Sequence, residues 1–413
     1  MRITRSDLGV TRREIRPGLE EEVREILAEV RRGGDEAVLR LTERFDKAAL
    51  APEELRVEPR ELEGSLGVLE PSVLRGLRTA IANVRAVARA QLPDPVSVQL
   101  EQGQRVEVDD VPVRRAAIYV PGGRAPYPST VVMGAVTARA AGVEEIVVCA
   151  PPGPGGRANP VVLAACVLCE VNEVYRMGGA QAIAALAYGT TSVRPVDVIA
   201  GPGNAWVQEA KRQVAFTEVG IDGIAGPSEL VVIADGAGVD PEAVALDLLA
   251  QAEHGADSPL WLLSPREEIL EDVIAGIERL ALDRPSVTDA RLEACAAGGE
   301  EALWIAEGLA PEHLQLVGDE AEKLADRVRR AGCVFVGAGA GTAFGDYVAG
   351  SNHVLPTGGA ARFQGVLSPA TFQRRMARVS LPGGAPGRLA PAGAALARAE
   401  GFPVHAESME RRA

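Results

Sequence analysis

The chain has only four histidines, at positions 254, 313, 353 and 405, so few places can offer an imidazole for chemistry. His313 follows Glu312 where a proline-containing loop meets the strand-like run LQLVG. An acid beside an imidazole can serve as general acid and general base, each worth roughly 10²- to 10⁴-fold in rate. Neighbouring residues of a regular strand point to opposite faces, so a shared site requires an irregular backbone at this junction. The alternative is that the pair forms an ordinary solvated turn.

A second group of residues has the donor atoms of a metal site. Gln251 and His254 are three residues apart, on one face of the last turn of a predicted helix. Together with Asp346 and His405 they would offer two oxygens and two imidazole nitrogens, a mixed set that suits zinc if the fold brings them together. Spacing alone does not show that it does. His254 could instead only cap the helix, whose C-terminal dipole favours a cation.

Asp346 and His353 occur in the glycine-rich stretch VGAGAGTAFGDYVAGSNHVLPTGG, which would be costly to order unless it served a site. The dinucleotide fingerprint GxGxxG fails in this stretch because its third glycine is missing. His353 is either a metal ligand or, more simply, the source of a loop-stabilising hydrogen bond. His405 lies in the tail of the chain, where a lone histidine is normally solvated. The signatures of hydrolytic zinc enzymes, serine hydrolases and P-loop proteins are absent from the sequence.

The charge balance limits the partners. The 413 residues carry 57 acidic and 43 basic side chains, a formal net charge of -14, which would repel nucleic acid or an anionic membrane. Apolar stretches end well before the ~20 residues of a membrane span and no secretory signal is visible, which predicts a cytoplasmic protein. The chain has an odd number of cysteines, five, and is long, which argues against a disulfide framework, so we expect reduced thiols. The single CxxC, Cys166 and Cys169, is expected to be buried in the core as packing residues. A small molecule is the expected partner.

The pattern of apolar residues changes along the chain. In residues 17–91, apolar side chains recur at intervals of three and four residues, which predicts helices. After residue 111, short apolar runs such as AAIYV, EEIVVCA, ELVVIA and CVFVG alternate with helix-length segments, which predicts βα units and mainly parallel sheets. One sheet is expected within about 119–228 and another from Glu229, with GIDGIAGPSE as the crossing point. The tail starts with a predicted linker, 381–393, and is too small for a core of its own, so it must pack on this subunit or on a partner.

Several motifs, taken together and in order, resemble histidinol dehydrogenase through most of the chain. They are RGGDEAVLRLTERFD, AIYVPGGRAPYPSTVVMGAVTARAAGV, GGAQAIAALAYGT, VDVIAGPGNAWVQEAKR, GIDGIAGPSELVVIAD, DLLAQAEHGADS, APEHLQL, GDYVAGSNHVLPTGGAARF and EGFPVHAES.

The resemblance implies an α/β fold with two Rossmann-like parallel-sheet domains that lack GxGxxG, a helical N-terminal section and a small C-terminal tail exchanged between the subunits of a homodimer. The expected division has 1–16 as an N-terminal segment and 17–118 with 229–370 as the larger domain, which carries most zinc and catalytic residues. Residues 119–228 then form the domain that contacts NAD, and 371–413 form the tail that contributes to the partner's site.

The resemblance also assigns residues to roles in a two-step, NAD-dependent oxidation of L-histidinol through L-histidinal to L-histidine. It implies catalysis by Glu312 and His313. One zinc ion per subunit would be bound by Gln251, His254, Asp346 and His405, with His405 supplied by the other subunit. The substrate would be surrounded by Ser228, Gln251, His254, Glu312, His313, Asp346, Glu400 and His405. NAD would be contacted by Tyr119, Gln181 and Asn204.

Two other interpretations remain open. A dehydrogenase of the same family could act on another hydroxylated substrate, although the presence of Glu400 and His405 favours histidinol. A zinc-dependent ligand-binding or hydrolytic protein is the alternative from a different class.

Overall fold

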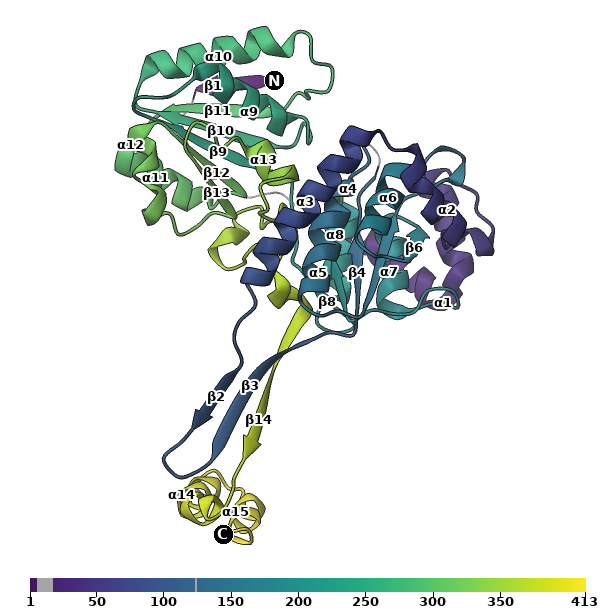
Figure 1. Cartoon of the computed structure of the whole chain (residues 1–413), viewed down its shortest axis with the longest axis vertical. Coiled ribbons are helices and arrows are strands. Elements are labelled where there is room, and N and C mark those ends of the chain that lie inside the picture. Colours follow the sequence, from purple (N-terminus) through teal and green to yellow (C-terminus); the bar gives the residue numbers. More distant parts are fainter. Residues whose placement is uncertain (6–17, 123–124) are drawn as a thin grey trace.

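Three sheets organise the chain, which is described by a computed structural model over residues 1–5, 18–122 and 125–413 (Figure 1). The two larger sheets are parallel throughout and are covered by helices. The third is a small antiparallel sheet that forms an arm. The predicted α/β class with two parallel sheets is confirmed.

The five-stranded sheet has the strand order β6-β5-β4-β7-β8. Its members are β4 (Arg115–Tyr119), β5 (Glu145–Ala150), β6 (Glu173–Arg176), β7 (Val198–Ala200) and β8 (Gly220–Ile221). Every residue of β4 is buried, and its alternate side chains enter two different cores, as Ala117 and Ile118 do. Burial on both faces explains why the run AAIYV is continuously apolar instead of alternating.

Helices cover both faces of this sheet. One face carries α1 (Leu19–Asp46), α7 (Gly179–Tyr188) and α8 (Ala205–Val214). The other carries α2 (Pro59–Gly64), α3 (Pro71–Ala90), α4 (Pro128–Val131), α5 (Thr137–Ala140) and α6 (Pro160–Leu168). The first helices therefore pack here, which differs from the expected division, where 17–118 belonged with 229–370. Helical periodicity shows which face of a helix is apolar, but not which sheet receives that face.

The six-stranded sheet has the strand order β1-β11-β10-β9-β12-β13. Its members are β1 (Arg2–Arg5), β9 (Leu230–Ala234), β10 (Pro259–Ser264), β11 (Arg291–Ala296), β12 (His313–Val317) and β13 (Cys333–Val336). Helices α9 (Pro241–Ala252) and α10 (Glu267–Ala281) pack in one core, and α11 (Gly299–Leu309) and α12 (Asp319–Glu322) in another. Strand β1 comes from the segment expected to stand apart, 1–16. The residues of that segment from position 6 on lie outside the described part of the chain.

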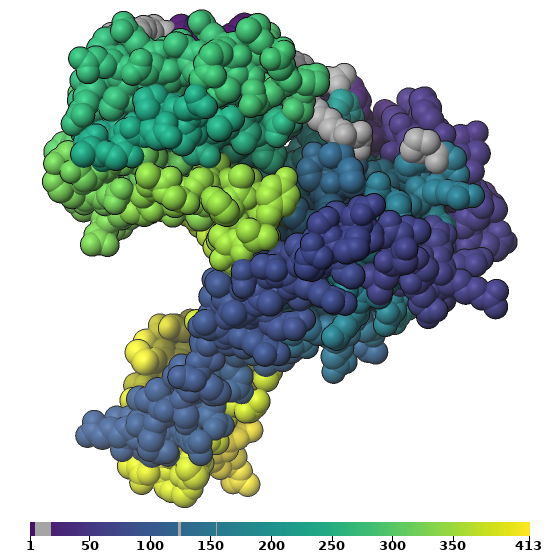
Figure 2. All heavy atoms as spheres, turned by 45° about the horizontal axis from the view of Figure 1, so that its top comes forward, coloured from purple at the N-terminus to yellow at the C-terminus, as the bar shows by residue number. Residues whose placement is uncertain are grey.

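The arm consists of β2 (Val96–Gln99), β3 (Arg105–Pro112) and β14 (Gln373–Ser380), and it carries α14 (Ala385–Ala399) and α15 (Pro403–Glu410) at its far end (Figure 1). The predicted linker over 381–393 is wrong, because α14 begins at Ala385 and continues through Pro391. The two tail helices share only a small cluster of Ala394, Ala397 and Ala406, with Met409 against it. Figure 2 shows the arm standing clear of the six-stranded sheet.

The crossing between the two parallel sheets, from Ile221 to Leu230, falls where GIDGIAGPSE predicts it. Lys211 and Asp222 form an ion pair in which both side chains are buried. Asp222 also accepts a hydrogen bond from the Gly201 amide at 2.7 Å, and its carbonyl oxygen accepts one from Gln364 at 2.8 Å. These contacts tie the loop after β7 to the segment that leads into the other sheet.

The remaining predictions on thiols and membranes can be compared with the structure. All five cysteines are free thiols, and burial raises the pKa of Cys166 well above its ordinary value and that of Cys169 to about 12. Both are buried in one core, as expected for packing residues. Across the described ranges, no helix combines the length and the apolar character needed to cross a membrane.

Candidate active site

The acid–imidazole pair lies at the amino end of β12. Glu312 precedes this strand and His313 is its first residue, and the two residues are only 6% and 2% exposed. Ala310, just before them, has a left-handed backbone with φ 46°, so the chain enters the strand through a turn. His313 Nδ1 and Glu312 Oε2 are 3.5 Å apart. The irregular backbone that a shared site requires is present, and the pair is not a solvated turn.

Main-chain groups of Glu229 orient both side chains. Glu312 Oε2 accepts a hydrogen bond from the Glu229 amide at 2.9 Å and another from the Ser228 hydroxyl. His313 Nδ1 lies 3.1 Å from the carbonyl oxygen of Glu229. Because a carbonyl oxygen can only accept, Nδ1 carries the ring proton and Nε2 is left to accept one. Nε2 faces Asp346, whose Oδ1 is 3.9 Å away.

Two buried carboxyl groups lie next to each other here. Burial raises the pKa of Glu312 and Asp346 adds to the rise, whereas His313 and the hydrogen bonds to the carboxylate oppose it. Burial and the charge of Glu312 together raise the pKa of Glu229 to about 7, against the lowering effect of two amide hydrogen bonds and of His313. Glu229 Oε1 accepts from the Gly358 amide at 2.8 Å, and its Oε2 accepts from the Glu312 amide at 3.4 Å. The site can therefore hold a proton near neutral pH, as general acid–base chemistry requires.

The predicted donor Gln251 lies in the last turn of α9, His254 lies two residues past the end of that helix, and Asp346 comes from α13 (Thr342–Tyr347). Gln251 is buried, and its Nε2 donates to the Ser228 hydroxyl at 2.5 Å. His254 Nε2 lies 3.9 Å from Asp346 Oδ2. An unbroken series of contacts thus joins Gln251, Ser228, Glu312, His313, Asp346 and His254.

His353 lies beside the same cluster. Burial lowers its pKa, while the neighbouring charge of Asp346 raises it. Its Nε2 is buried and has no hydrogen-bond partner in the described part of the chain. The loop-stabilising hydrogen bond expected for His353 is therefore not made by this nitrogen, which leaves it available to a bound molecule.

Glu400 and His405 are not part of this cluster. Both are exposed and belong to the tail helices, where His405 packs against the ring of Phe402 with centroids 5.4 Å apart. In Figure 1 the tail helices and strand β12 lie at opposite ends of the molecule. Over residues 1–5, 18–122 and 125–413, no three His, Cys, Asp or Glu side chains form a metal-binding group. Of the four predicted zinc ligands, one chain alone places His254 beside Asp346, links Gln251 to them through Ser228, Glu312 and His313, and keeps His405 apart.

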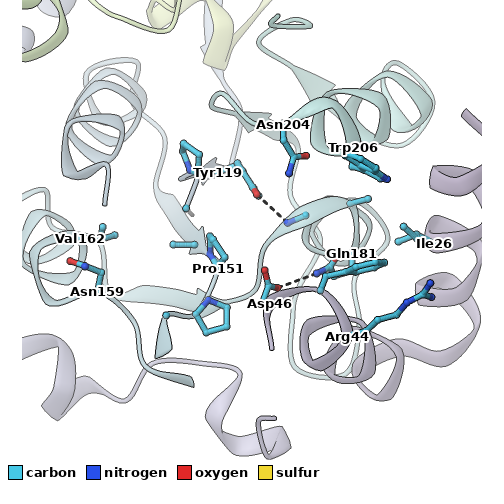
Figure 3. Close-up of a pocket in the computed structure, with 18 of the residues that line it drawn as sticks. Ile26, Arg44, Asp46, Tyr119, Pro151, Asn159, Val162, Gln181, Asn204 and Trp206 are labelled. Atoms are coloured by element: carbon cyan, nitrogen blue, oxygen red, sulfur yellow. Dashed lines mark hydrogen bonds between the residues drawn. The ribbon is translucent and has the colours of Figure 1, made fainter. Parts of the chain in front are cut away.

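A separate cavity of about 870 Å³ opens at the carboxyl edge of the five-stranded sheet (Figure 3). Tyr119 ends β4, Gln181 lies in the first turn of α7, and Asn204 precedes α8, and all three line the cavity. This edge is where open α/β sheets generally bind ligands. The volume falls within the range of small-molecule sites, about 300 to 1,000 Å³.

The walls of this cavity contain two helix starts. The hydroxyl of Tyr119 accepts a hydrogen bond from the Gly179 amide at 3.0 Å, at the beginning of α7. Asn204 caps α8 by accepting from the Val207 amide at 3.1 Å. Helix N-termini carry partial positive charge, so this edge suits an anion such as a pyrophosphate. Burial raises the pKa of Tyr119 well above its ordinary value, so its hydroxyl remains a neutral donor.

Two acidic residues at these sites were missed by the sequence analysis. Glu229 follows Ser228 in the motif GIAGPSE, and a buried acid next to an assigned residue was the available signal. Asp46 lines the cavity and accepts a hydrogen bond from Gln181 at 3.3 Å. It ends the motif RGGDEAVLRLTERFD, but nothing in that motif shows that its helix packs beside α7.

The fold and these two sites define an α/β enzyme with a cofactor-sized cavity on one parallel sheet and an acid–imidazole centre on the other. A sequence model of the family described as histidinol dehydrogenase matches residues 11–413. A histidinol dehydrogenase of Gluconobacter oxydans is 44% identical over 399 residues, 95% of this chain and 92% of that protein. One of Cereibacter sphaeroides is 44% identical over 408 residues, 97% of this chain and 93% of that protein.

A crystal structure of histidinol dehydrogenase from Elizabethkingia anophelis has a TM-score of 0.91 and 31% sequence identity, and the match covers 100% of this chain and 98% of that one. The chain belongs to the histidinol dehydrogenase family, and with it to the oxidoreductases of histidine biosynthesis.

Replacing Glu229 with glutamine should flatten the pH dependence of unfolding. A carboxyl group with a raised pKa binds its proton more tightly in the folded state, so it lowers the free energy of unfolding as pH rises from 4.5 to about 7. This fall is on the order of 3 kcal/mol, and the amide of Glu229→Gln cannot titrate. Urea denaturation at about pH 5 and about pH 7.5 measures the difference. The exposed Glu268→Gln is the matched control, and an unchanged pH slope in Glu229→Gln would refute the coupling.

Proposed function

We propose that this chain oxidises L-histidinol through L-histidinal to L-histidine with two molecules of NAD and one zinc ion per site. The observation that carries the proposal is the contiguous cluster of six polar side chains, with Gln251, Glu312 and His313 buried and His254 open to solvent, in a chain of the histidinol dehydrogenase family. The six are Ser228, Gln251, His254, Glu312, His313 and Asp346. Tyr119, Gln181 and Asn204 around the cavity of the other sheet are the proposed NAD contacts.

The donor set around Asp346 fits zinc in part. The amide oxygen of Gln251, the imidazole of His254 and the carboxylate of Asp346 are all donors that zinc accepts. They come from two elements that meet, since His254 and Asp346 are already 3.9 Å apart. A fourth ligand has to come from outside this cluster, and His405 of a second copy is the proposed one. When bound, zinc would orient the substrate and polarise it.

The arm explains how a second copy could supply that ligand. Its apolar side chains are exposed in the single chain, including Val96, Val98, Val379, Leu396, Phe402 and Val404, each at least 44% exposed. A ribbon and two short helices with so much exposed apolar surface need a covering partner. A homodimer that exchanges the tails would bury these side chains and deliver Glu400 and His405 to the other subunit's cluster.

The side chains divide the chemistry between two bases. His313 Nε2, the free acceptor of the ring, would take the hydroxyl proton of the alcohol in the first oxidation and that of the hydrated aldehyde in the second. Between the two oxidations, Glu312 would take a proton from water as the water adds to the aldehyde. Two bases are needed because water loses its proton in a different step from the hydroxyl groups that are oxidised. NAD, when bound, accepts the hydride in each oxidation.

Reduced-nicotinamide absorbance tests this function directly. Histidinol and NAD should yield two equivalents of reduced cofactor per substrate. One equivalent with another alcohol would support a family member with a different substrate, and none with any alcohol would support a zinc-dependent binding or hydrolytic protein.

In the same assay, His313→Asn should slow the oxidation of both histidinol and histidinal, by roughly 10²-fold or more. Glu312→Gln should impair the oxidation of histidinal more than that of histidinol. Small and equal losses in both variants would refute the two-base assignment.

Mixing two inactive variants tests the shared site. His254→Ala and His405→Ala should each lack zinc and activity, because each removes a ligand from every site. Mixed dimers should regain one intact site of two, so random mixing should restore about a quarter of the wild-type sites. Zinc content and activity both report the recovery. No recovery in verified mixed dimers would place His405 in its own chain's site or outside any site.

A further inference from the structure

We propose that Asp46 makes the cofactor cavity select NAD over NADP, by accepting a hydrogen bond from the adenosine ribose and repelling a 2′-phosphate. This inference rests on the proposed use of the cavity by NAD.

Asp46 is placed to contact a bound molecule. It is the last residue of α1, and Figure 3 shows its side chain directed toward Gln181 on the wall of the cavity. Gln181 donates to one carboxylate oxygen, Oδ2, at 3.3 Å. The other oxygen can therefore accept from a ligand. Burial raises the pKa of Asp46 to about 6, so the group is mostly ionised at neutral pH and gains from any hydroxyl that donates to it.

The position of α1 identifies which half of the cofactor Asp46 would meet. Hydride transfer requires the nicotinamide to face the cluster at His313, in the six-stranded sheet. Helix α1 lies on the side of the five-stranded sheet away from that cluster (Figure 1). Pro121, Gly122, Ala125 and Pro126 also line the cavity. Tyr127, which follows Pro126, lies close to Tyr347. Burial and the charges of Asp346 and Glu253 raise the pKa of Tyr347, and the charge of Tyr127 adds to this rise. The nicotinamide end of a bound NAD would therefore lie toward Tyr127, and its adenosine end would lie at Asp46.

The charges around this end oppose a phosphate. Helix α1 contributes four carboxylates to the cavity, from Glu22, Glu25, Glu29 and Asp46, and one guanidinium, from Arg44. Arg44 lies over the ring of Phe45, 4.9 Å from its centroid. A 2′-phosphate brings about -1.5 to -2 further charges into this mainly acidic wall. A ribose hydroxyl adds no charge and donates the hydrogen bond that Asp46 can accept.

Calorimetric titration of the wild-type protein with ADP-ribose and with 2′-phospho-ADP-ribose measures the preference without turnover. We expect ADP-ribose to bind at least about tenfold more tightly, the size of one hydrogen bond to a charged group. Asp46→Asn should weaken the binding of ADP-ribose and strengthen the binding of 2′-phospho-ADP-ribose, so that the ratio of the two affinities falls by about tenfold.

Glu25→Gln is the matched control, because it removes one carboxylate from the same cavity wall. It should change the preference by no more than about twofold. The role of Asp46 would be overturned if Asp46→Asn kept the wild-type preference for ADP-ribose, or if Glu25→Gln lost as much of that preference as Asp46→Asn does. Either result would leave the NAD site itself intact. A folded wild-type protein that binds neither ligand would refute the NAD cavity itself, and Asp46 selectivity with it.

Discussion

The crowding of carboxyl groups around Glu312 is the constraint on which the rest of the site depends. The charge of Glu312 raises the pKa of Glu229, and the charge of Asp346 raises that of Glu312; both glutamates are buried, where like charges repel strongly. The contacts that offset this repulsion are amides, a hydroxyl and imidazoles. Such a cluster either holds protons near neutral pH or binds a cation. Both responses would suit the proposed oxidation, which needs bases and a metal in one place, and a cation at Asp346 would alter the proton affinity of the carboxyl groups beside it.

The two parallel sheets use opposite edges for their sites. The proposed cofactor cavity lies at the carboxyl edge of its sheet, as is usual for open α/β folds. The reactive cluster lies at the amino edge of the other, because Ser228 and Glu312 each precede a strand and α9 returns antiparallel to the sheet to end there. The crossing segment links the two edges, since Asp222 binds the loop that carries Asn204 through Gly201 and also binds Gln364. The loop that carries Asn204, the crossing segment and Gln364 are thus tied together by direct hydrogen bonds.

The sequence predicts local features well and distant contacts poorly. Buried strands such as β4 and the helix that ends near Gln251 and His254 follow from apolar runs, capping residues and periodicity. The packing of α1 against α7 does not, because many surfaces could bury the same apolar stripe, and Asp46 was missed for that reason. Strand β1 was also missed, since four residues at the chain start carry no periodic signal. Glu229 was missed because its role depends on main-chain hydrogen bonds to a segment 83 residues away. His405 lies away from its own chain's cluster, so the ligand role proposed for it depends on a second subunit that the sequence of one chain does not place.

The central claim is that one metal ion joins Gln251, His254 and Asp346 of one subunit to His405 of another. Anomalous diffraction at the zinc edge, from crystals of the zinc-loaded protein, tests it most directly. The account predicts one peak per chain, within about 2.0 to 2.2 Å of the oxygen and nitrogen donors of these four residues. A peak elsewhere, or one that His405 of the second subunit does not approach, would contradict it.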